Sequence, residues 1–216
     1  MDLLDRHVFP LINDLVLGRR VHALRRDLAS RASGRVLEIG AGTGLNFEHY
    51  PTGVEVVAVE RAEGMRHRAS ERARSRDVRA EVRVIDGDAQ KLALDSDSFD
   101  TVVSTFVLCS VPDLARCLQE ARRVLKPNGT LCVVEHVRSP DQQTARWQDR
   151  VRPVWQTVFG GCDPTRDIAG ALERAGFDIE ALSRIELPLP WLAKPGIAGA
   201  LPLSAAASKT RSHRDH

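Results

Sequence analysis

Three glycines at alternate positions, Gly40, Gly42 and Gly44, directly follow the short apolar run 35–39. A run of this kind, rich in β-branched residues, predicts a buried strand that leads into a tight turn. Glycine permits positive φ and lets a ligand approach the main chain, and a helix after the turn would offer unpaired N–H groups. A second apolar run ends at Glu60, where a carboxylate closing a parallel strand can accept hydrogen bonds from both hydroxyls of a ribose. The pattern therefore predicts a ligand that carries a ribose.

The spacing of the glycines separates two classes of such ligand. A dinucleotide-binding turn has the pattern G-x-G-x-x-G, whereas this chain has Leu45 at the third glycine position. Glu38 places a negative charge two residues before the first glycine, where it would repel a pyrophosphate and attract an ammonium group. The pattern resembles the first motif of the class I S-adenosylmethionine (SAM) methyltransferases. The resemblance implies SAM as the cofactor, with Glu38 facing the methionine amino group and Glu60 holding the ribose. A strand and turn without a ligand is the alternative.

Further positions match the cofactor motifs of that family. Asp88 follows the strand expected at 81–86, and a carboxylate there can accept a hydrogen bond from the adenine amino group; a helix cap or turn role is the alternative. The resemblance also implies that Met65 lies near the adenine, although a core methionine fits the same spacing. The residues expected around the cofactor are Glu38, Gly40, Ala41, Gly42, Thr43, Gly44, Asn46, Glu60, Arg61, Met65, Asp88, Ala89, Gln90, Thr105 and Phe106.

Strand and helix patterns alternate along the chain, which is typical of an α/β fold with a parallel sheet. The resemblance implies a Rossmann-like class I methyltransferase with a seven-stranded, mostly parallel sheet and an antiparallel last strand. We expect N-terminal cap or lid helices over 1–33, with lipid contact as the alternative, a methyltransferase domain over 34–207 and a disordered tail over 208–216. The runs expected as strands are 35–39, 54–59, 81–86, 98–104, 130–135, 176–187 and 197–201.

Later motifs narrow the resemblance. They look like the methyltransferase-like group that includes the mammalian alkyl-thiol S-methyltransferases. That group begins with a hydrophobic membrane anchor, whereas residues 1–33 here have the pattern of charged amphipathic helices, so membrane residence is not carried over. The motifs are Phe106–Val111, Glu135-His136-Val137, Trp147-Gln148, Pro153-Val154-Trp155, Gly161-Cys162, Arg166 and 171–175.

The acceptor side of the site follows from these motifs. Methyl transfer needs a nucleophile in line with the activated carbon in a dry pocket, and a thiol attacks as its thiolate. His136, at the end of the fifth expected strand, is the candidate to take the acceptor's proton; a purely structural hydrogen bond is the alternative. Cys109, Trp155, Cys162 and Arg166 are expected to line the acceptor pocket. Simple packing is the alternative for Cys109, and a structural ion pair is the alternative for Arg166. The aromatic segment 143–162 is expected to form an apolar wall of the pocket, with a local core as the alternative.

Several functions remain open at this point. A small lipophilic thiol is the leading acceptor. A quinone or phenol methylated on oxygen or carbon is the second, because the cofactor half alone also resembles quinone-biosynthesis methyltransferases. A lipid amine is the third, and a SAM-binding module without catalysis is the alternative from another class.

Composition bounds the remaining possibilities. At 216 residues and 43% hydrophobic, the chain is most simply one domain, and its net charge of +2 argues against nucleic acid as a partner. The four cysteines have no C-x-x-C spacing, which indicates reduced thiols in a cytoplasmic protein and no metal site. No export signal and no apolar run long enough for a membrane span occurs, so only weak peripheral membrane contact is considered. The oligomeric state is left open.

Overall fold

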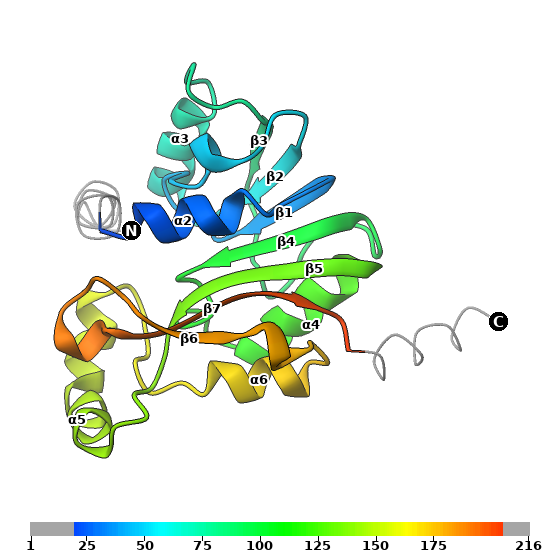
Figure 1. Cartoon of the computed structure of the whole chain (residues 1–216). Coiled ribbons are helices and arrows are strands. Elements are labelled where there is room, and N and C mark those ends of the chain that lie inside the picture. Colours follow the sequence, from blue (N-terminus) through cyan, green and yellow to red (C-terminus); the bar gives the residue numbers. More distant parts are fainter. Residues whose placement is uncertain (1–19, 205–216) are drawn as a thin grey trace.

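The computed structural model describes residues 20–204, which form a seven-stranded sheet with helices on both faces. The strand order is β3-β2-β1-β4-β5-β7-β6 (Figure 1). Strands β1 to β5 pair in parallel, and β7 runs antiparallel to both β5 and β6. The predicted fold, a mostly parallel sheet with an antiparallel last strand, is therefore confirmed. The strands are β1 (Arg35–Ile39), β2 (Glu55–Val59), β3 (Glu81–Ile85), β4 (Phe99–Thr105), β5 (Leu125–His136), β6 (Ser183–Glu186) and β7 (Pro195–Pro202).

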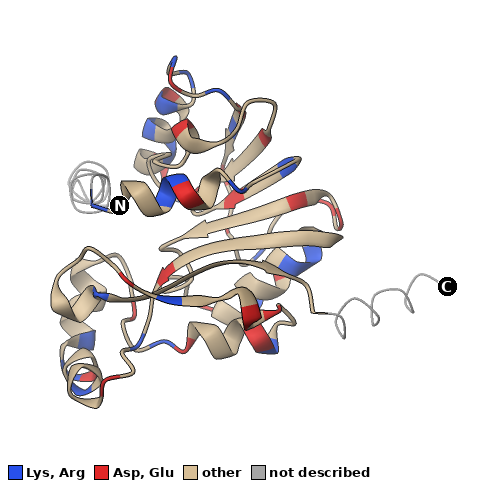
Figure 2. Ribbon diagram, viewed as in Figure 1, with Lys and Arg blue, Asp and Glu red and all other residues tan. Residues whose placement is uncertain are grey.

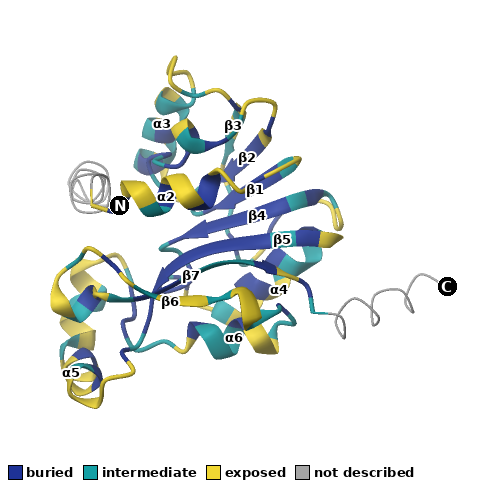
Figure 3. Cartoon of the chain, viewed as in Figure 1, coloured by how far each residue is buried: buried dark blue, intermediate teal, exposed yellow. Residues whose placement is uncertain are grey.

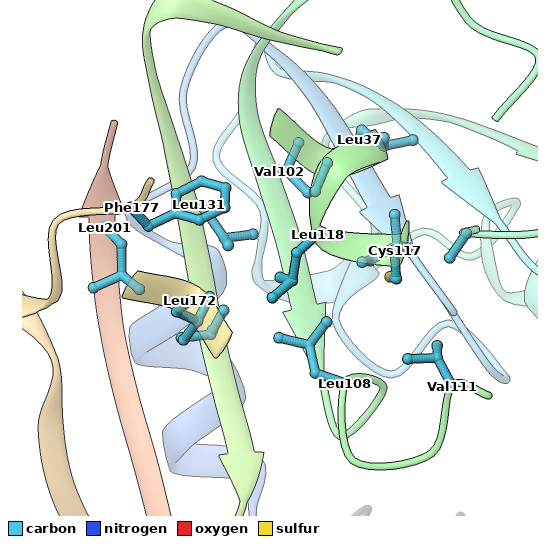
Figure 4. Packing of buried hydrophobic residues seen from close by; sticks show 14 of the residues in the cluster. Leu37, Val102, Leu108, Val111, Cys117, Leu118, Leu131, Leu172, Phe177 and Leu201 are labelled. Atoms are coloured by element: carbon cyan, nitrogen blue, oxygen red, sulfur yellow. The ribbon is translucent and has the colours of Figure 1, made fainter. Parts of the chain in front are cut away.

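Two layers of helix cover the sheet because its central strands are apolar on both faces. Leu37 of β1 belongs to the cluster that includes α4 and α6, whereas its neighbour Val36 belongs to the cluster that includes α2 and α3. This alternation is the period of two expected of a strand. Figure 4 shows the first cluster, in which Leu118 and Leu172 pack over Val102 and Leu131. The helices are α2 (His22–Ala29), α3 (Glu63–Arg72), α4 (Leu114–Val124), α5 (Gln142–Val158) and α6 (Ile168–Arg174).

The strands and helices differ in how far they are buried, while charged residues are spread over them. The central strands are buried along most of their length, whereas α5 is largely exposed (Figure 3). Basic and acidic residues are interspersed over the described elements (Figure 2). No helix within residues 20–204 has the length and apolar character needed to cross a membrane.

Two expected elements differ from the structure. The sixth strand was expected over 176–187, but only Ser183–Glu186 pairs as β6, because Asp178 caps the short 3₁₀ helix Ile179–Ala181 by accepting a hydrogen bond from Glu180 N. The fifth strand was expected over 130–135, but β5 begins at Leu125, so it includes 126–129, whose Pro-Asn-Gly sequence is typical of a turn; its register to β4 shifts between Phe99 and Thr101. The N-terminal cap was expected over 1–33, and only its part from residue 20 onward, which contains α2, falls within the described residues. Residues 1–19 and the tail expected over 208–216 lie outside them.

Candidate active site

The glycine turn lies between the carboxyl ends of β1 and β4, where the strand order reverses and where doubly wound sheets bind ligands. Gly40, Gly42 and Gly44 all have positive φ, between 58° and 80°. A Cβ on Gly40 would lie 2.6 Å from the Val107 side chain. The alternate glycines are therefore required by the backbone, and they leave the turn without side chains at these positions.

Glu60 fastens this turn to β2. Its Oε2 accepts a hydrogen bond from Gly42 N at 2.9 Å and its Oε1 accepts one from Ala62 N at 2.7 Å. Each carboxylate oxygen has a second acceptor position, and the residue is only half-buried. Glu60 can thus hold the glycine turn and still accept hydrogen bonds from a ribose.

Glu38 lies in a buried polar network under the turn. Its side chain is 2% exposed and accepts hydrogen bonds from Asn46 Nδ2 at 2.9 Å and from the Tyr50 hydroxyl at 2.8 Å. Asn46 also donates to Thr105 Oγ1 at 3.0 Å, and its Oδ1 accepts from Arg25 Nη1 at 3.0 Å. Burial raises the pKa of Glu38 to about 7, although the Tyr50 hydrogen bond and the Arg25 charge oppose the rise. The network makes Asn46 a residue that positions Glu38.

The turn after β4 has a strained backbone and an unexpected support. Phe106 has a φ of 59°, a left-handed conformation that costs a side-chain-bearing residue about 1–2 kcal/mol. The Glu135 carboxylate, which is completely buried, accepts hydrogen bonds from the backbone N–H groups that follow Phe106 and from a hydroxyl of β4. Burial raises its pKa, and these hydrogen bonds oppose the rise. The donors are Ser104 Oγ, Val107 N, Leu108 N and Cys109 N, at 2.9–3.2 Å.

Nothing in the sequence indicates this role for Glu135 beyond its place at a strand end. An acid after an apolar run has the same pattern whether it points to solvent or supports a neighbouring loop. Only the register of β5 against β4, in which Val134 pairs with Thr105, places this side chain under the turn.

Asp88 lies in a compact turn after β3. Its carboxylate accepts hydrogen bonds from Gln90 N and Gln90 Nε2 at 2.9 Å, and these bonds lower its pKa. Gln90 Oε1 in turn accepts from Asp113 N at 2.7 Å, which joins this turn to the start of α4. Asp88 therefore has the turn role that was the alternative from the sequence, and its contact with adenine remains a prediction. Nearby, Arg61 is exposed and Met65 is buried.

Three smaller residues of the predicted cofactor site are buried in the turns themselves. Ala41 donates its N–H to Val59 O, and Thr43 accepts hydrogen bonds from Arg72 through both its carbonyl and its hydroxyl. Ala89 is 9% exposed. These residues shape the turn backbones.

The predicted acceptor residues meet at the carboxyl end of β5. His136 is 3% exposed; its Nδ1 lies 3.5 Å from Cys162 Sγ and its Nε2 lies 3.2 Å from Leu192 O. The ring of Trp155, from α5, lies 5.9 Å from the His136 ring. Asp163 N donates to Cys109 O at 2.8 Å, so the loop that carries Cys162 lies against the β4 turn.

This cluster favours an ionised sulfur. A hydrogen bond from Cys109 lowers the pKa of Cys162, and the hydrogen bond and charge of His136 lower it further, whereas burial opposes the shift. Conversely, the interaction with Cys162 and burial raise the pKa of Cys109. The Trp155 indole N–H has no hydrogen-bond partner among the described residues, yet its proximity also lowers the pKa of Cys162. The corner can therefore hold a thiolate.

Arg166 supports the site in a way that its predicted role did not include. Its Nη1 donates to Leu108 O at 2.8 Å, within the β4 turn. Asp163, which is 4% exposed, accepts from Thr165 Oγ1 at 2.6 Å and pairs with Arg152 at 2.8 Å. These bonds tie the Cys162 loop to α5 and to the turn.

The arrangement fits SAM as a cofactor. The glycine turn offers bare main chain, Glu60 retains acceptor positions at the end of β2, and Glu38 places a carboxyl group directly below the turn. The bare main chain and the two carboxyl groups therefore suit a ligand that carries hydroxyl and amino groups at this edge of the sheet.

Comparison with known proteins agrees with this arrangement. Residues 37–133 match the family described as the methyltransferase domain. The chain is 36% identical over 167 residues to thiol S-methyltransferase TMT1A of Homo sapiens, covering 76% of this chain and 68% of that protein. It is 36% identical over 184 residues to human thiol S-methyltransferase TMT1B, covering 81% and 75%.

A solved structure shares the fold over nearly the whole chain. The SAM-dependent methyltransferase of Thermotoga maritima, described as a possible histamine N-methyltransferase, superposes with a TM-score of 0.68 and 22% identity, covering 93% of this chain and 98% of that one. The chain belongs to the class I SAM-dependent methyltransferases, in which it is close to the TMT1A and TMT1B group.

Proposed function

We propose that this enzyme transfers the methyl group of SAM to a small lipophilic thiol. Two relatives that share 36% identity over most of the chain are named thiol S-methyltransferases. The observation that carries the proposal is the buried corner in which Cys162 Sγ lies 3.5 Å from His136 Nδ1, on a loop that is hydrogen-bonded to Cys109 O. A thiol acceptor attacks as its thiolate, and polarisable sulfur and imidazole groups suit such an acceptor.

SAM supplies an activated methyl on a sulfonium, and the chain then needs to bind, orient and exclude water. We infer that the predicted cofactor residues divide this work. Glu60 would accept hydrogen bonds from the ribose, Asp88 would accept one from adenine, and Glu38 would face the amino group, with Thr105 and Phe106 beside the methionine moiety. Their positions at the carboxyl ends of β1 to β4 support these roles.

His136 acts on this corner through a defined tautomer. A neutral ring that donates Nε2–H to Leu192 O keeps its lone pair at Nδ1, which faces Cys162 Sγ. We infer that in this tautomer Nδ1 accepts a hydrogen bond from the Cys162 thiol. The role predicted from the sequence, direct removal of the acceptor's proton, would require Cys162 to move aside.

The apolar side of the pocket would come from α5. Trp155 stacks on Phe159 at 4.3 Å between ring centroids and also faces His136. Such a wall suits a lipophilic substituent on the acceptor. Phenol, quinone and amine acceptors have no comparable support in this corner. Cytoplasmic residence and weak peripheral membrane contact remain predictions from the sequence, and the oligomeric state remains open.

The proposal is tested by following S-adenosylhomocysteine formation with matched alkyl thiol, phenol and amine acceptors. We expect turnover with the thiol alone; turnover with the phenol or amine and none with the thiol would refute it. Glu60→Ala is expected to abolish SAM binding in calorimetry, with exposed Glu81→Ala as its control. His136→Ala is expected to lower thiol turnover with little change in SAM affinity, with exposed His67→Ala as its control.

A further inference from the structure

A second group of side chains that could bind a ligand lies where α2 contacts the 3₁₀ helix that follows the glycine turn. His22 begins α2, and Glu48 and His49 belong to the 3₁₀ helix η3 (Phe47–His49). Glu48 Oε1 lies 3.6 Å from His22 Nε2 and 3.4 Å from His49 Nε2, and the three atoms lie within 4.8 Å of one another. Two imidazoles and one carboxylate thus converge from two separate elements.

Two of the three spacings among these atoms match a metal centre, and the third, between the two histidine nitrogens, is within 4.8 Å. Two ligand atoms about 2.1 Å from a tetrahedral zinc ion lie roughly 3.4 Å apart. The two nitrogen-to-oxygen distances are close to that value before any adjustment of the side chains. His22 and Glu48 are about half exposed, at 50% and 45% of their side chains. They can therefore rotate slightly to complete the geometry.

A second observation points to a ligand. The His49 side chain is 7% exposed, and its Nε2 is a buried nitrogen without a hydrogen bond to any described group, although it faces the Glu48 carboxylate. A buried ring nitrogen without a partner is costly, and native structures rarely keep one without a reason. Coordination of a cation would satisfy it. The His22 and His49 rings lie edge to face with centroids 4.6 Å apart, which holds both near the same point.

We propose that His22, Glu48 and His49 form a binding site for a divalent transition-metal ion of the zinc class, with water in the fourth position. Two nitrogen ligands and one carboxylate suit Zn²⁺ and its neighbours better than Ca²⁺ or Mg²⁺, which prefer oxygen ligands alone. The proposal is independent of the acceptor chemistry at the thiol corner.

The ion would join α2 to the cofactor site. Arg25 is three residues beyond His22, on the same side of α2, and donates to Asn46 of the glycine turn. Asn46 directly precedes η3 and bonds Glu38. A metal held between α2 and η3 would therefore restrain the same helix that contributes a charge to the Glu38 network.

Nearby positive charge sets the expected affinity. Arg25 and Arg26 both act electrostatically on His49, and they oppose a bound cation as well. The site consequently has three protein ligands but an unfavourable field. We expect moderate affinity, measurable with free Zn²⁺ in the micromolar range.

The test is calorimetric titration of the untagged, full-length chain with Zn²⁺ alone. His22→Ala and Glu48→Gln alter half-exposed ligands and avoid disturbing the buried His49. His67→Ala is the matched control, because His67 and Glu71 form an exposed histidine–glutamate pair at 3.3 Å on α3 with no third ligand among residues 20–204. We expect one Zn²⁺ per chain in the wild type and in His67→Ala, and affinity lowered more than about tenfold in the other two variants, since even outer-shell changes at metal sites cost 10- to 100-fold.

Each other outcome would overturn the proposal. Equal affinity in the wild type and Glu48→Gln would assign binding to other histidines of the chain, and loss in only one of the two ligand variants would exclude a three-ligand site. Co²⁺ provides a second measurement, because a four-coordinate ion absorbs strongly in the visible range. A spectrum that persists in His22→Ala would refute the site even if that variant were less stable. Zn²⁺ should also raise the Tm of the wild type and His67→Ala, but not of His22→Ala.

Discussion

Tyr50→Phe tests how Glu38 recognises the cofactor. Tyr50 is the only tyrosine of the chain, it is 2% exposed, and its hydroxyl donates to Glu38 Oε2 at 2.8 Å. Removing the hydroxyl keeps the ring and its packing but deletes one hydrogen bond to the carboxylate. That bond opposes the effect of burial on Glu38, whose pKa is already raised to about 7. The variant should therefore raise the pKa of Glu38 further.

The size of the effect follows from the strength of the bond. A hydrogen bond to a charged group contributes about 1.5–3 kcal/mol, and about 1.4 kcal/mol corresponds to one pH unit. Taking the lower end, the pKa of Glu38 rises from about 7 to about 8. At pH 7 the ionised fraction then falls from about one half to about one tenth. If the ionised carboxylate attracts the ammonium group of the cofactor, affinity at pH 7 falls about fivefold.

The assay is calorimetric titration with S-adenosylhomocysteine, which keeps the amino group of SAM, at pH 7 and pH 9. Titration of the ligand amine is common to both proteins and cancels in the ratio of their affinities. We expect a ratio of about five at pH 7 that approaches one at pH 9, where Glu38 is ionised in both. When Tyr50→Phe is introduced into the Glu38→Gln variant, the affinity ratio should no longer depend on pH. An equal ratio at both pH values, or a pH-dependent ratio that survives in Glu38→Gln, would refute the reasoning.

Three further predictions concern stability. The pKa of the Glu38 carboxyl is about 7 in the folded chain and ordinarily 4.5. Protonation of Glu38 therefore stabilises the fold below about pH 4.5, and this contribution of about 3 kcal/mol is lost as pH rises through 7. In Glu38→Gln, urea unfolding at pH 5 and pH 8 should no longer show that loss. Gly40→Ala should cost more stability than Gly53→Ala, because both have positive φ but a Cβ meets Val107 only at Gly40; equal losses would contradict this. Glu135→Gln should cost about 1–3 kcal/mol in urea unfolding, since one backbone N–H loses its acceptor, and a loss below about 0.5 kcal/mol would contradict it.

The parts of the fold predicted well are those specified by local pattern. Gly40, Gly42 and Gly44 were expected at positions that need positive φ, which glycine permits, and all three have it. The apolar runs of the central strands were expected to be buried because they contain few polar side chains. Helix α5 is harder to predict because Pro153 lies inside it, where proline removes a helical hydrogen bond. The segment 143–162 was expected to form an aromatic wall or a local core, without an assigned secondary structure, and the structure makes most of it one long helix.

The parts of the site that the sequence could not predict depend on contacts between distant residues. Arg25 and Asn46 are 21 positions apart, and Asn46 and Thr105 are 59 apart, yet they share one network. His22 and Glu48 show no metal-ligand spacing along the chain, so a search by cysteine spacing predicted no metal. Sequence motifs identify which residues are unusual, but the register of strands and the docking of α2 decide which of them meet.

The network around Glu38 makes α2 more than a cover for the sheet. Arg25 lies 94% buried, bonds Asn46 and lowers the pKa of Glu38 by its charge. The guanidinium also lies 5.8 Å from the ring of Phe106, on the other side of the glycine turn. Any displacement of α2 would therefore remove a positive charge from beside this carboxyl group, and would raise the pKa of Glu38 further. Because coupling between two sites is reciprocal, a cofactor that binds the ionised form of Glu38 must in turn favour the docked position of α2.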